Sequence, residues 1–303
     1  MKKLFIVGGT GTLGINFCKY ALKNNLFDSI VLFSRNEKNQ VMAKRDLNTN
    51  LVHFIIGDVR DKDALRSAMA GSTHVLNTAA IKHIDLAEQN YNETVKTNIY
   101  GAQNVADIIK EMSKTSIIKN IYISTDKAAM PNSLYGSTKL VAEKIFTNID
   151  GNNINSSCIR FGNILGSSGS IFEYWNNNKS KQIFLSDRDL ERYIIKINTA
   201  CEFIDFVFTN MIGGEVFIPS MNKFKIKDIA EIFSDNIIED ELRPGEKISE
   251  ILYSPEEANR TIAFDHHFLI KPNNTIKYRL YTKDMQFKND YATIGDIADY
   301  FEQ

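Results

Sequence analysis

The sequence predicts an α/β protein built on a doubly wound parallel sheet, with a smaller, discontinuous substrate domain towards the C-terminus. Short runs of apolar and β-branched residues alternate with amphipathic stretches as far as about residue 160, which is the pattern of parallel strands joined by helices. The predicted strands are residues 3–7, 29–33, 51–56, 73–77 and 117–123. Because the first strand leads through a glycine-rich turn into a helix, we expect a sheet of the Rossmann type.

The glycine turn contains Gly8, Gly11 and Gly14, which are spaced three apart. A turn without Cβ atoms lets backbone N–H groups approach a pyrophosphate at the start of a helix, where the helix dipole also favours negative charge. Its position between the first strand and a helix distinguishes it from a plain glycine turn and predicts a nucleotide site. The residues expected to bind the cofactor here are Gly8, Thr10, Gly11, Thr12 and Leu13.

The end of the second strand, Ser34-Arg35, indicates which nucleotide is bound. NAD sites usually carry an acid at this place for the ribose hydroxyls, whereas this chain offers a hydroxyl and a guanidinium. We therefore expect NADP, with Arg35 on the 2′-phosphate; the alternative is an exposed arginine that begins a charged helix. Asp58, after the third strand, is expected to meet the adenine edge. Further cofactor contacts are expected from Val59, Ala79 and Ala80.

Residues 124–139 read STDKAAMPNSLYGSTK and follow the carboxyl end of a predicted strand, where ligands bind in open α/β sheets. A helix is predicted over residues 134–148, on which Tyr135 and Lys139 stand four apart and share one face. An ammonium beside a phenol favours the phenolate, so we expect a lowered pKa for Tyr135, which would act as a base towards a sugar or alcohol hydroxyl. The alternative is a tyrosine at a helix start followed by a surface lysine.

The composition limits the partners of the protein. Lys and Arg number 36 against 37 Asp and Glu, so no net positive field attracts nucleic acid or an anionic membrane. No apolar run approaches the ~20 residues that a membrane helix needs. Three widely spaced cysteines in apolar contexts suit a reducing compartment, and we expect a cytoplasmic protein. Adjacent His266 and His267 do not share a helical face, so no metal site is expected.

The glycine turn, Asn77-Thr78-Ala79-Ala80, Asn98, Tyr135 and Lys139 together resemble the extended short-chain dehydrogenases/reductases, which act mostly on nucleotide sugars. Within that group, three segments are similar to the polysaccharide-biosynthesis dehydratases, specifically the UDP-N-acetylglucosamine 4,6-dehydratases of the C5-inverting type. The three segments are residues 124–127, 160–167 and 242–247. The resemblance covers roughly residues 1–255. The tail from Asn259, with an alternating run at residues 275–281, does not match.

The resemblance implies a reaction on a UDP-N-acetylhexosamine. Tyr135 would remove the proton of the 4-hydroxyl while the C4 hydride passes to NADP⁺, which gives a 4-keto sugar with an acidic C5–H. A neutral Lys127 would take the C5 proton, a protonated Asp126 would protonate the departing 6-hydroxyl, and the hydride would return to C6. Thr125 would hydrogen-bond the sugar near O4. The alternative for Asp126-Lys127 is a solvated turn with a mutual ion pair.

The resemblance also assigns residues around the sugar and the diphosphate. The guanidinium of Arg243, in a Pro-Gly turn, would grip a UDP phosphate, and Arg160 is expected to meet the cofactor and the substrate. Asn98 would support the active-site water network; the alternative is a buried amide that the backbone satisfies. The substrate contacts expected are Lys82, Asn163, Arg192, Arg243 and Glu246.

We expect residues 1–165 and 191–219 to form the NADP-binding domain and residues 166–190 and 220–303 to form the nucleotide-sugar domain, with the site between them and a homo-oligomer as the assembly. Two other functions stay open. A UDP-sugar 4-epimerase would share most of these residues but would not need the Asp126-Lys127 pair. A non-enzymatic NADP-sensing regulator would keep the glycines but would not need a tyrosine and a lysine in helical register.

Overall fold

The computed structural model describes residues 1–176, 182–272 and 287–302, so the alternating run at 275–281 lies outside the described residues. A nine-stranded sheet forms the centre of the protein, with the strand order β13-β14-β10-β6-β5-β4-β1-β2-β3. Its strands are β1 (Lys3–Val7), β2 (Ser29–Ser34), β3 (Val52–Ile56), β4 (His74–Asn77), β5 (Ile118–Thr125), β6 (Ile154–Phe161), β10 (Val216–Pro219), β13 (Thr261–Ala263) and β14 (His267–Ile270).

The first five predicted strands are confirmed as β1 to β5. They pair in parallel through β6 and β10, and only the edge pairs that involve β13 and β14 are antiparallel. The strand order reverses between β1 and β4, because β2 lies on one side of β1 and β4 on the other. In an open α/β sheet this switch point leaves a crevice at the carboxyl ends of the strands, which is where a dinucleotide binds.

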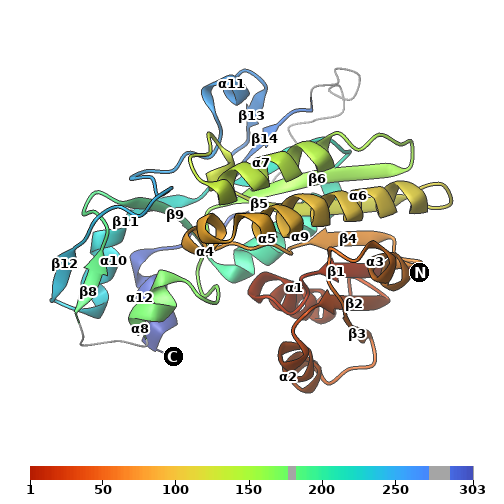
Figure 1. Cartoon of the computed structure of the whole chain (residues 1–303), viewed down its shortest axis with the longest axis horizontal. Helices are drawn as coiled ribbons and strands as arrows, with labels where there is room; N and C mark the ends of the chain where they lie inside the picture. Colours follow the sequence, from red (N-terminus) through yellow and green to blue (C-terminus); the bar gives the residue numbers. More distant parts are fainter. Residues whose placement is uncertain (177–181, 273–286, 303) are drawn as a thin grey trace.

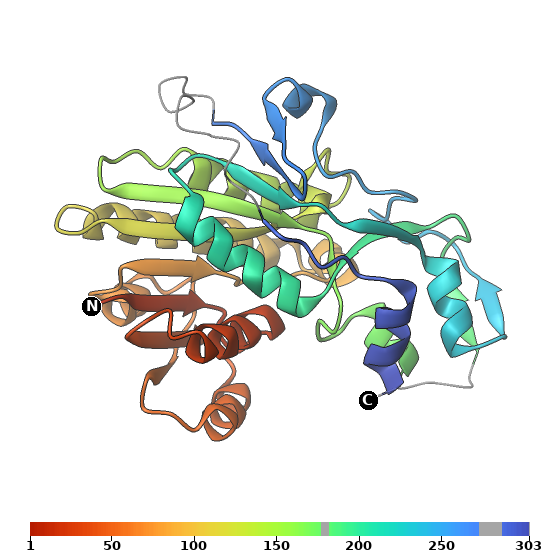
Figure 2. The same cartoon turned by 180° about the vertical axis from the view of Figure 1, so that it is seen from behind.

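Helices cover both faces of this sheet. Helices α6 and α7 lie on the face seen in Figure 1, and α1 and α9 lie on the face seen in Figure 2. The predicted helix at 134–148 is confirmed as α7. The helices are α1 (Thr12–Lys23), α2 (Glu37–Leu47), α3 (Lys62–Met69), α4 (Ile84–Gln89), α5 (Tyr91–Val95), the π-helix η1 (Lys96–Tyr100), α6 (Gly101–Met112), the 3₁₀-helix η2 (Asp126–Ala128), α7 (Leu134–Thr147), α8 (Ile171–Asn176), α9 (Ile197–Asn210), α10 (Ile226–Phe233), α11 (Pro255–Ala258) and α12 (Ile294–Glu302).

A second, smaller core lies at the left of Figure 1. It contains a three-stranded sheet and a two-stranded sheet, packed with α8, α10 and α12. Trp175 is buried there between Phe172 and Phe233, with ring centroids 5.9 and 5.8 Å away. The additional strands are β7 (Asn163–Ile164), β9 (Glu191–Ile195) and β11 (Asn222–Lys225) in one sheet, and β8 (Ile183–Leu185) and β12 (Ile237–Glu239) in the other.

The two cores do not follow the expected domain limits in every segment. Strands β13 and β14, from the expected nucleotide-sugar domain, extend the large sheet beside β10, and Leu252 and Ile270 pack in its core. Strand β9, from the expected NADP-binding domain, pairs instead with β7 and β11. The short apolar strand β14 gives β10 a partner on its outer side, and a sheet edge without such a partner would expose unpaired backbone groups.

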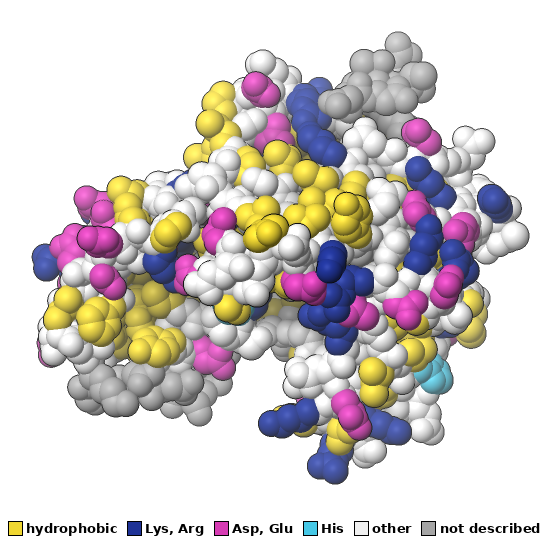
Figure 3. Space-filling view, viewed as in Figure 1, with side chains coloured by type: hydrophobic (Ala, Val, Ile, Leu, Met, Phe, Trp, Pro, Cys, Tyr) yellow, Lys and Arg dark blue, Asp and Glu magenta, His cyan; other side chains and the backbone are white. Residues whose placement is uncertain are grey.

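The face seen in Figure 3 carries exposed hydrophobic side chains over α4 to α7 among patches of mixed charge. They include Leu86, Tyr91, Tyr100 and Val141, which are between 42% and 61% exposed. Within the described ranges, no helix has both the length and the apolar character to cross a membrane.

Candidate active site

A cavity of about 760 Å³ opens at the carboxyl ends of the strands and extends into the second core. Nineteen of the predicted site residues line it; Asp58, Asp126, Arg160 and Asn98 do not. The lining residues among those predicted are Gly8, Thr10, Gly11, Thr12, Leu13, Ser34, Arg35, Val59, Ala79, Ala80, Lys82, Thr125, Lys127, Tyr135, Lys139, Asn163, Arg192, Arg243 and Glu246. One cavity therefore joins the expected cofactor, reaction and substrate residues.

The glycine turn forms the floor of the cofactor end. Gly8 has a φ of +78°, and a Cβ atom there would lie 2.8 Å from Oγ1 of Thr78 and 2.9 Å from the backbone nitrogen of Ala79, so only glycine fits. Gly11 is the N-cap of α1 and provides no side-chain cap. The first amides of α1 therefore point, without a capping side chain, to the end of the helix where its dipole favours an anion, which fits a pyrophosphate.

Arg35 is 53% exposed at the rim of the cavity, and its guanidinium lies 3.7 Å from the carboxylate of Asp58. The expected contact between the Asp58 carboxylate and adenine stays a prediction, and Asp58 does not itself line the cavity. Arg60 donates from Nε to both Asp58 oxygens at 3.0 Å and from Nη2 at 2.6 Å. Burial raises the pKa of Asp58, but the hydrogen bonds from Arg60 outweigh it and lower the pKa below its ordinary value.

Tyr135 and Lys139 lie on the first turns of α7, behind the N-cap Ser133, and both are almost completely buried. The Lys139 ammonium donates to the carbonyl oxygen of Ile123 at 2.5 Å and lies 4.1 Å from the centre of the Tyr122 ring. Burial lowers the pKa of Lys139 to about 7, because an ammonium is poorly solvated in this interior. Lys139 is thus held at the end of β5 by the backbone.

The prediction of a lowered pKa for Tyr135 is wrong when only the groups of the protein act on it. Burial raises the pKa of Tyr135, and the negative charge of Asp126 raises it further, whereas a hydrogen bond with Thr125 acts in the opposite direction. Lys139 does not contribute to this pKa, and its ammonium contacts Ile123 and Tyr122 instead. Tyr135 is therefore a neutral phenol near pH 7 until a positive charge enters the cavity.

Asp126 and Lys127 form η2 directly after β5. Oδ1 of Asp126 accepts from Oγ1 of Thr125 at 2.9 Å and from Nζ of Lys127 at 3.1 Å. Lys127 lines the cavity, whereas Asp126 is completely buried behind it, and Oδ2 of Asp126 has no hydrogen-bond partner among the described residues. The Asp126 carboxyl therefore reaches the cavity through Thr125 or Lys127, and the alternative of a solvated turn does not apply.

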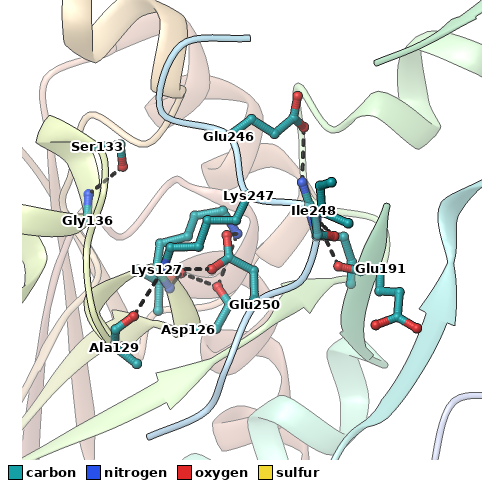
Figure 4. A network of polar contacts seen from close by, with 12 residues as sticks. Asp126, Lys127, Ala129, Ser133, Gly136, Glu191, Glu246, Lys247, Ile248 and Glu250 are labelled. Carbon is teal, nitrogen blue, oxygen red and sulfur yellow. Dashed lines mark hydrogen bonds and ion pairs between the residues drawn. The ribbon is translucent and has the colours of Figure 1, made fainter. Parts of the chain in front are cut away.

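The sequence reasoning missed two charged residues beside this pair, Glu250, which contacts Lys127, and Lys247, which contacts Glu250. The carboxylate of Glu250 is 2% exposed and lies 3.6 Å from Nζ of Lys127 and 3.3 Å from Nζ of Lys247 (Figure 4). Lys247 also donates to the carbonyl oxygen of Ala129 at 3.1 Å. Both residues belong to a segment, residues 243–250, that we call the strap. The sequence signal that could have identified them is their three-residue spacing directly after Arg-Pro-Gly-Glu.

The strap also carries two of the predicted substrate residues. Arg243 donates to Glu246 at 2.8 and 3.1 Å, and Arg192 of β9 lies 3.0 Å from the same carboxylate. Burial raises the pKa of Glu246, but the hydrogen bonds and charges of Arg243 and the charge of Arg192 outweigh it and lower the pKa. The structure thus brings these three residues together on one wall of the cavity.

Lys82 contacts the loop that follows β7. Its Nζ donates to the carbonyl oxygen of Ser168 at 2.6 Å, and the backbone nitrogen of Ser168 donates to Oγ1 of Thr12 at 3.0 Å. Burial lowers the pKa of Lys82. Lys82 and the loop after Asn163 therefore close the cavity between the glycine turn and the sugar end.

The expectation that Arg160 meets cofactor and substrate is wrong. Its side chain is completely buried, and its Nη2 atom lies 2.7 Å from Glu143 of α7 while its Nη1 atom lies 2.9 Å from Glu257 of α11. Arg160 is absent from the cavity lining. The two carboxylates, which are distant in sequence, draw the guanidinium into the interior, and removing one partner of such a buried pair costs about 3–5 kcal/mol.

Asn98 follows the alternative that the sequence left open. It is 1% exposed in η1, accepts from the backbone nitrogen of Ile81 at 2.8 Å, and donates to the carbonyl of Ile81 and to Thr138 at 3.0 Å. These bonds fix the backbone between Ala80 and Lys82 against α7. Asn98 therefore shapes the cavity wall from behind.

Comparisons with known proteins agree with this geometry. The sequence profile of a family described as "Polysaccharide biosynthesis protein" matches residues 4–272. A UDP-N-acetylglucosamine 4,6-dehydratase (inverting) of Campylobacter jejuni subsp. jejuni serotype O:23/36 is 37% identical over 281 residues, which cover 90% of this chain and 83% of the relative. A UDP-glucose 4-epimerase of Rickettsia bellii is 29% identical over 284 residues, which cover 89% of this chain and 82% of the relative.

The fold is also that of a solved structure. The X-ray structure of Pen from Bacillus thuringiensis superposes on this chain with a TM-score of 0.85 at 30% sequence identity, and the match covers 90% of each chain.

Proposed function

We propose, because this chain belongs to the extended short-chain dehydrogenases/reductases and within them to the polysaccharide biosynthesis protein family, that it is an NADP-dependent UDP-N-acetylhexosamine 4,6-dehydratase that inverts C5. One observation carries the proposal. Lys127 lines the same cavity as Tyr135, and Asp126 is bonded to Lys127 directly behind it. A second acid/base pair beside a tyrosine–lysine pair serves elimination, whereas simple oxidation and reduction at C4 do not need it.

Tyr135 would begin the reaction by taking the proton of the sugar 4-hydroxyl. When bound, the oxidised nicotinamide cofactor would supply the hydride acceptor at C4, the hydride donor at C6 and a positive charge. A positive charge in the cavity lowers the pKa of Tyr135 and so opposes the effects of burial and of Asp126. Thr125, which lines the cavity and bonds Asp126, would hydrogen-bond the sugar near O4.

The elimination step needs a neutral amine and a protonated carboxyl. A proton transfer from Lys127 to Asp126 across their 3.1 Å contact produces both groups at once. Lys127 would then take the C5 proton, which the C4 ketone acidifies, and the C6–O bond would break. The proton of Asp126 would leave with the 6-hydroxyl as water, relayed through Thr125 because Asp126 does not line the cavity. After the hydride returns to C6, a proton from solvent would add to C5 on the opposite face and invert it.

The cofactor assignment depends on the rim of the cavity. The uncapped start of α1 fits a pyrophosphate, and Arg35 offers an exposed guanidinium at the rim for a 2′-phosphate. The wall formed by Arg192, Arg243 and Glu246 would hold the UDP part of the substrate.

The exposed hydrophobic side chains over α4 to α7 support the expected homo-oligomer.

Product analysis tests the proposal. The purified protein is incubated with UDP-N-acetylglucosamine and NADP⁺, and the product is identified by NMR. We expect a UDP-2-acetamido-4-keto-2,6-dideoxyhexose of L-arabino configuration. The similarity to a UDP-glucose 4-epimerase keeps the 4-epimerase as the second candidate. A product that keeps its 6-hydroxyl and changes only at C4 would establish the epimerase; absence of any turnover would favour the NADP-sensing regulator.

A further inference from the structure

Glu250 is a buried carboxylate that the reaction described above does not use. It belongs to the strap, whereas Lys127 belongs to the segment after β5, so the two come from distant parts of the chain (Figure 4). The Glu250 side chain is 2% exposed and lies between the ammonium groups of Lys127, at 3.6 Å, and Lys247, at 3.3 Å. A charge removed from water in this way is retained only where its partners compensate for the lost solvation.

The contacts of Glu250 are ion pairs without full hydrogen-bond geometry. Its Oε2 atom has no hydrogen-bond partner among the described residues, and neither has Oδ2 of Asp126 on the other side of Lys127. A buried polar atom without a hydrogen bond costs about 1–3 kcal/mol and calls for an explanation. Each of the two acids that flank the amine of Lys127, Asp126 and Glu250, therefore has one buried carboxylate oxygen without a hydrogen bond.

We propose that Glu250 is a positioning residue for Lys127, and that it also stabilises the ammonium that forms when Lys127 takes the C5 proton. This inference rests on the proposed function. Asp126 holds the amine from η2, whereas Glu250 holds it from the strap, so the amine is fixed between two carboxylates. Lys247 anchors Glu250 by its ion pair and by its bond to the carbonyl of Ala129.

The arrangement also separates the two half-reactions. Oxidation of C4 uses Tyr135 and Lys139, neither of which contacts Glu250 in the described structure, whereas removal of the C5 proton uses Lys127. Loss of Glu250 is therefore expected to slow the second half-reaction and to spare the first. A residue with a merely structural role would affect both alike.

The test compares Glu250→Gln, Glu250→Asp and the parent in D₂O with UDP-N-acetylglucosamine and NADP⁺. We expect Glu250→Gln to incorporate deuterium at C5 about 10- to 100-fold more slowly, the usual effect of a misplaced reacting group, while the single-turnover rate of cofactor reduction stays within about 3-fold. Glu250→Asp, which keeps the charge, should recover part of the C5 rate. The matched control is Glu191→Gln, because Glu191 pairs with Lys223 and with Ser249 of the strap but does not line the cavity.

A double variant covers the case in which Glu250→Gln does not fold. Lys247→Met with Glu250→Gln removes one charge of each sign and leaves no unpaired ammonium at the strap; it should show the same split between the two half-reactions. Parental C5 exchange in either folded variant overturns the inference, and so does failure of both variants to fold, because Glu250 would then be structural. A parent protein without a 6-deoxy product would instead overturn the proposed function.

Discussion

Lys139 donates to the carbonyl oxygen of Ile123 at 2.5 Å, so the backbone of β5, rather than the phenol of Tyr135, holds its ammonium. Burial brings the pKa of Lys139 to about 7, so this group is close to its titration point in neutral solution. The raised pKa of Tyr135 and the lowered pKa of Lys139 have the same cause, because burial disfavours the charged form of each.

The first prediction concerns Tyr135. We expect Tyr135→Phe to keep the fold and substrate binding but to lose turnover by ~10²–10⁴-fold, the usual contribution of a positioned general base. Product formation under saturating substrate measures the loss, and the circular dichroism spectrum checks the fold. Near-parental turnover would mean that Tyr135 only packs against the cavity wall.

The second prediction concerns Asp126 and Lys127. Asp126→Asn and Lys127→Ala should stall dehydration after C4 oxidation, because the elimination loses its acid or its base. Stopped-flow absorbance of the dihydronicotinamide should then show reduced cofactor that accumulates transiently. In the parent, run in D₂O, deuterium should enter C5, whereas C6 should receive the C4 hydride of the substrate. A 6-deoxy product with unchanged C5 configuration would end the inverting assignment alone.

The third prediction concerns Arg35. Arg35→Ala should weaken NADP⁺ binding by about 10- to 100-fold, the worth of one hydrogen bond to a charged group, and should leave NAD⁺ binding unchanged. Isothermal titration with both cofactors measures the ratio. Lys44, on α2 but outside the cavity lining, offers a control as Lys44→Ala. Equal affinity of the parent for the two cofactors would defeat the NADP assignment.

The fourth prediction concerns His267, which is fully buried against Phe264, with ring centroids 4.4 Å apart, and has no hydrogen bond on either ring nitrogen among the described residues. Burial, with a smaller effect of His266, lowers the pKa of His267 to about 4. His267 therefore binds a proton below about pH 6.5 in the unfolded chain but only below about pH 4 in the folded chain. Between these pH values the free energy of unfolding falls as the pH falls.

His267→Phe should remove this contribution. Between pH 7 and pH 5, the free energy of unfolding of the parent should fall by about 2 kcal/mol more than that of the variant. Urea unfolding at the two pH values measures the difference. Exposed His53, as His53→Gln, is the control. The same pH dependence in parent and His267→Phe would show that the histidine is not buried as described.

Local patterns in the sequence were sufficient to predict strands β1 to β5 and most of the residues that line the cavity. The glycine turn, the strand ends and the spacing of Tyr135 and Lys139 are all set by neighbouring residues. Arg160 and Glu250 could not be placed in this way, because their partners, Glu257 and Lys127, are brought to them only by the fold. The prediction of a lowered pKa for Tyr135 failed for the same reason, since the sequence does not give the depth of burial.

The strap and the helix after it are held by two buried ion pairs, one to β9 of the three-stranded sheet and one to β6 of the large sheet. Arg192 holds Glu246 within it, and Arg160 holds Glu257 just after it. A chimera could exchange the C-terminal part of the chain between relatives in order to change the sugar preference. Such an exchange would also replace the counter-ions of Lys127 and Arg160. A functional chimera would have to transplant β6, the strap and α11 as one inherited unit, so recognition and chemistry in this protein are expected to evolve together.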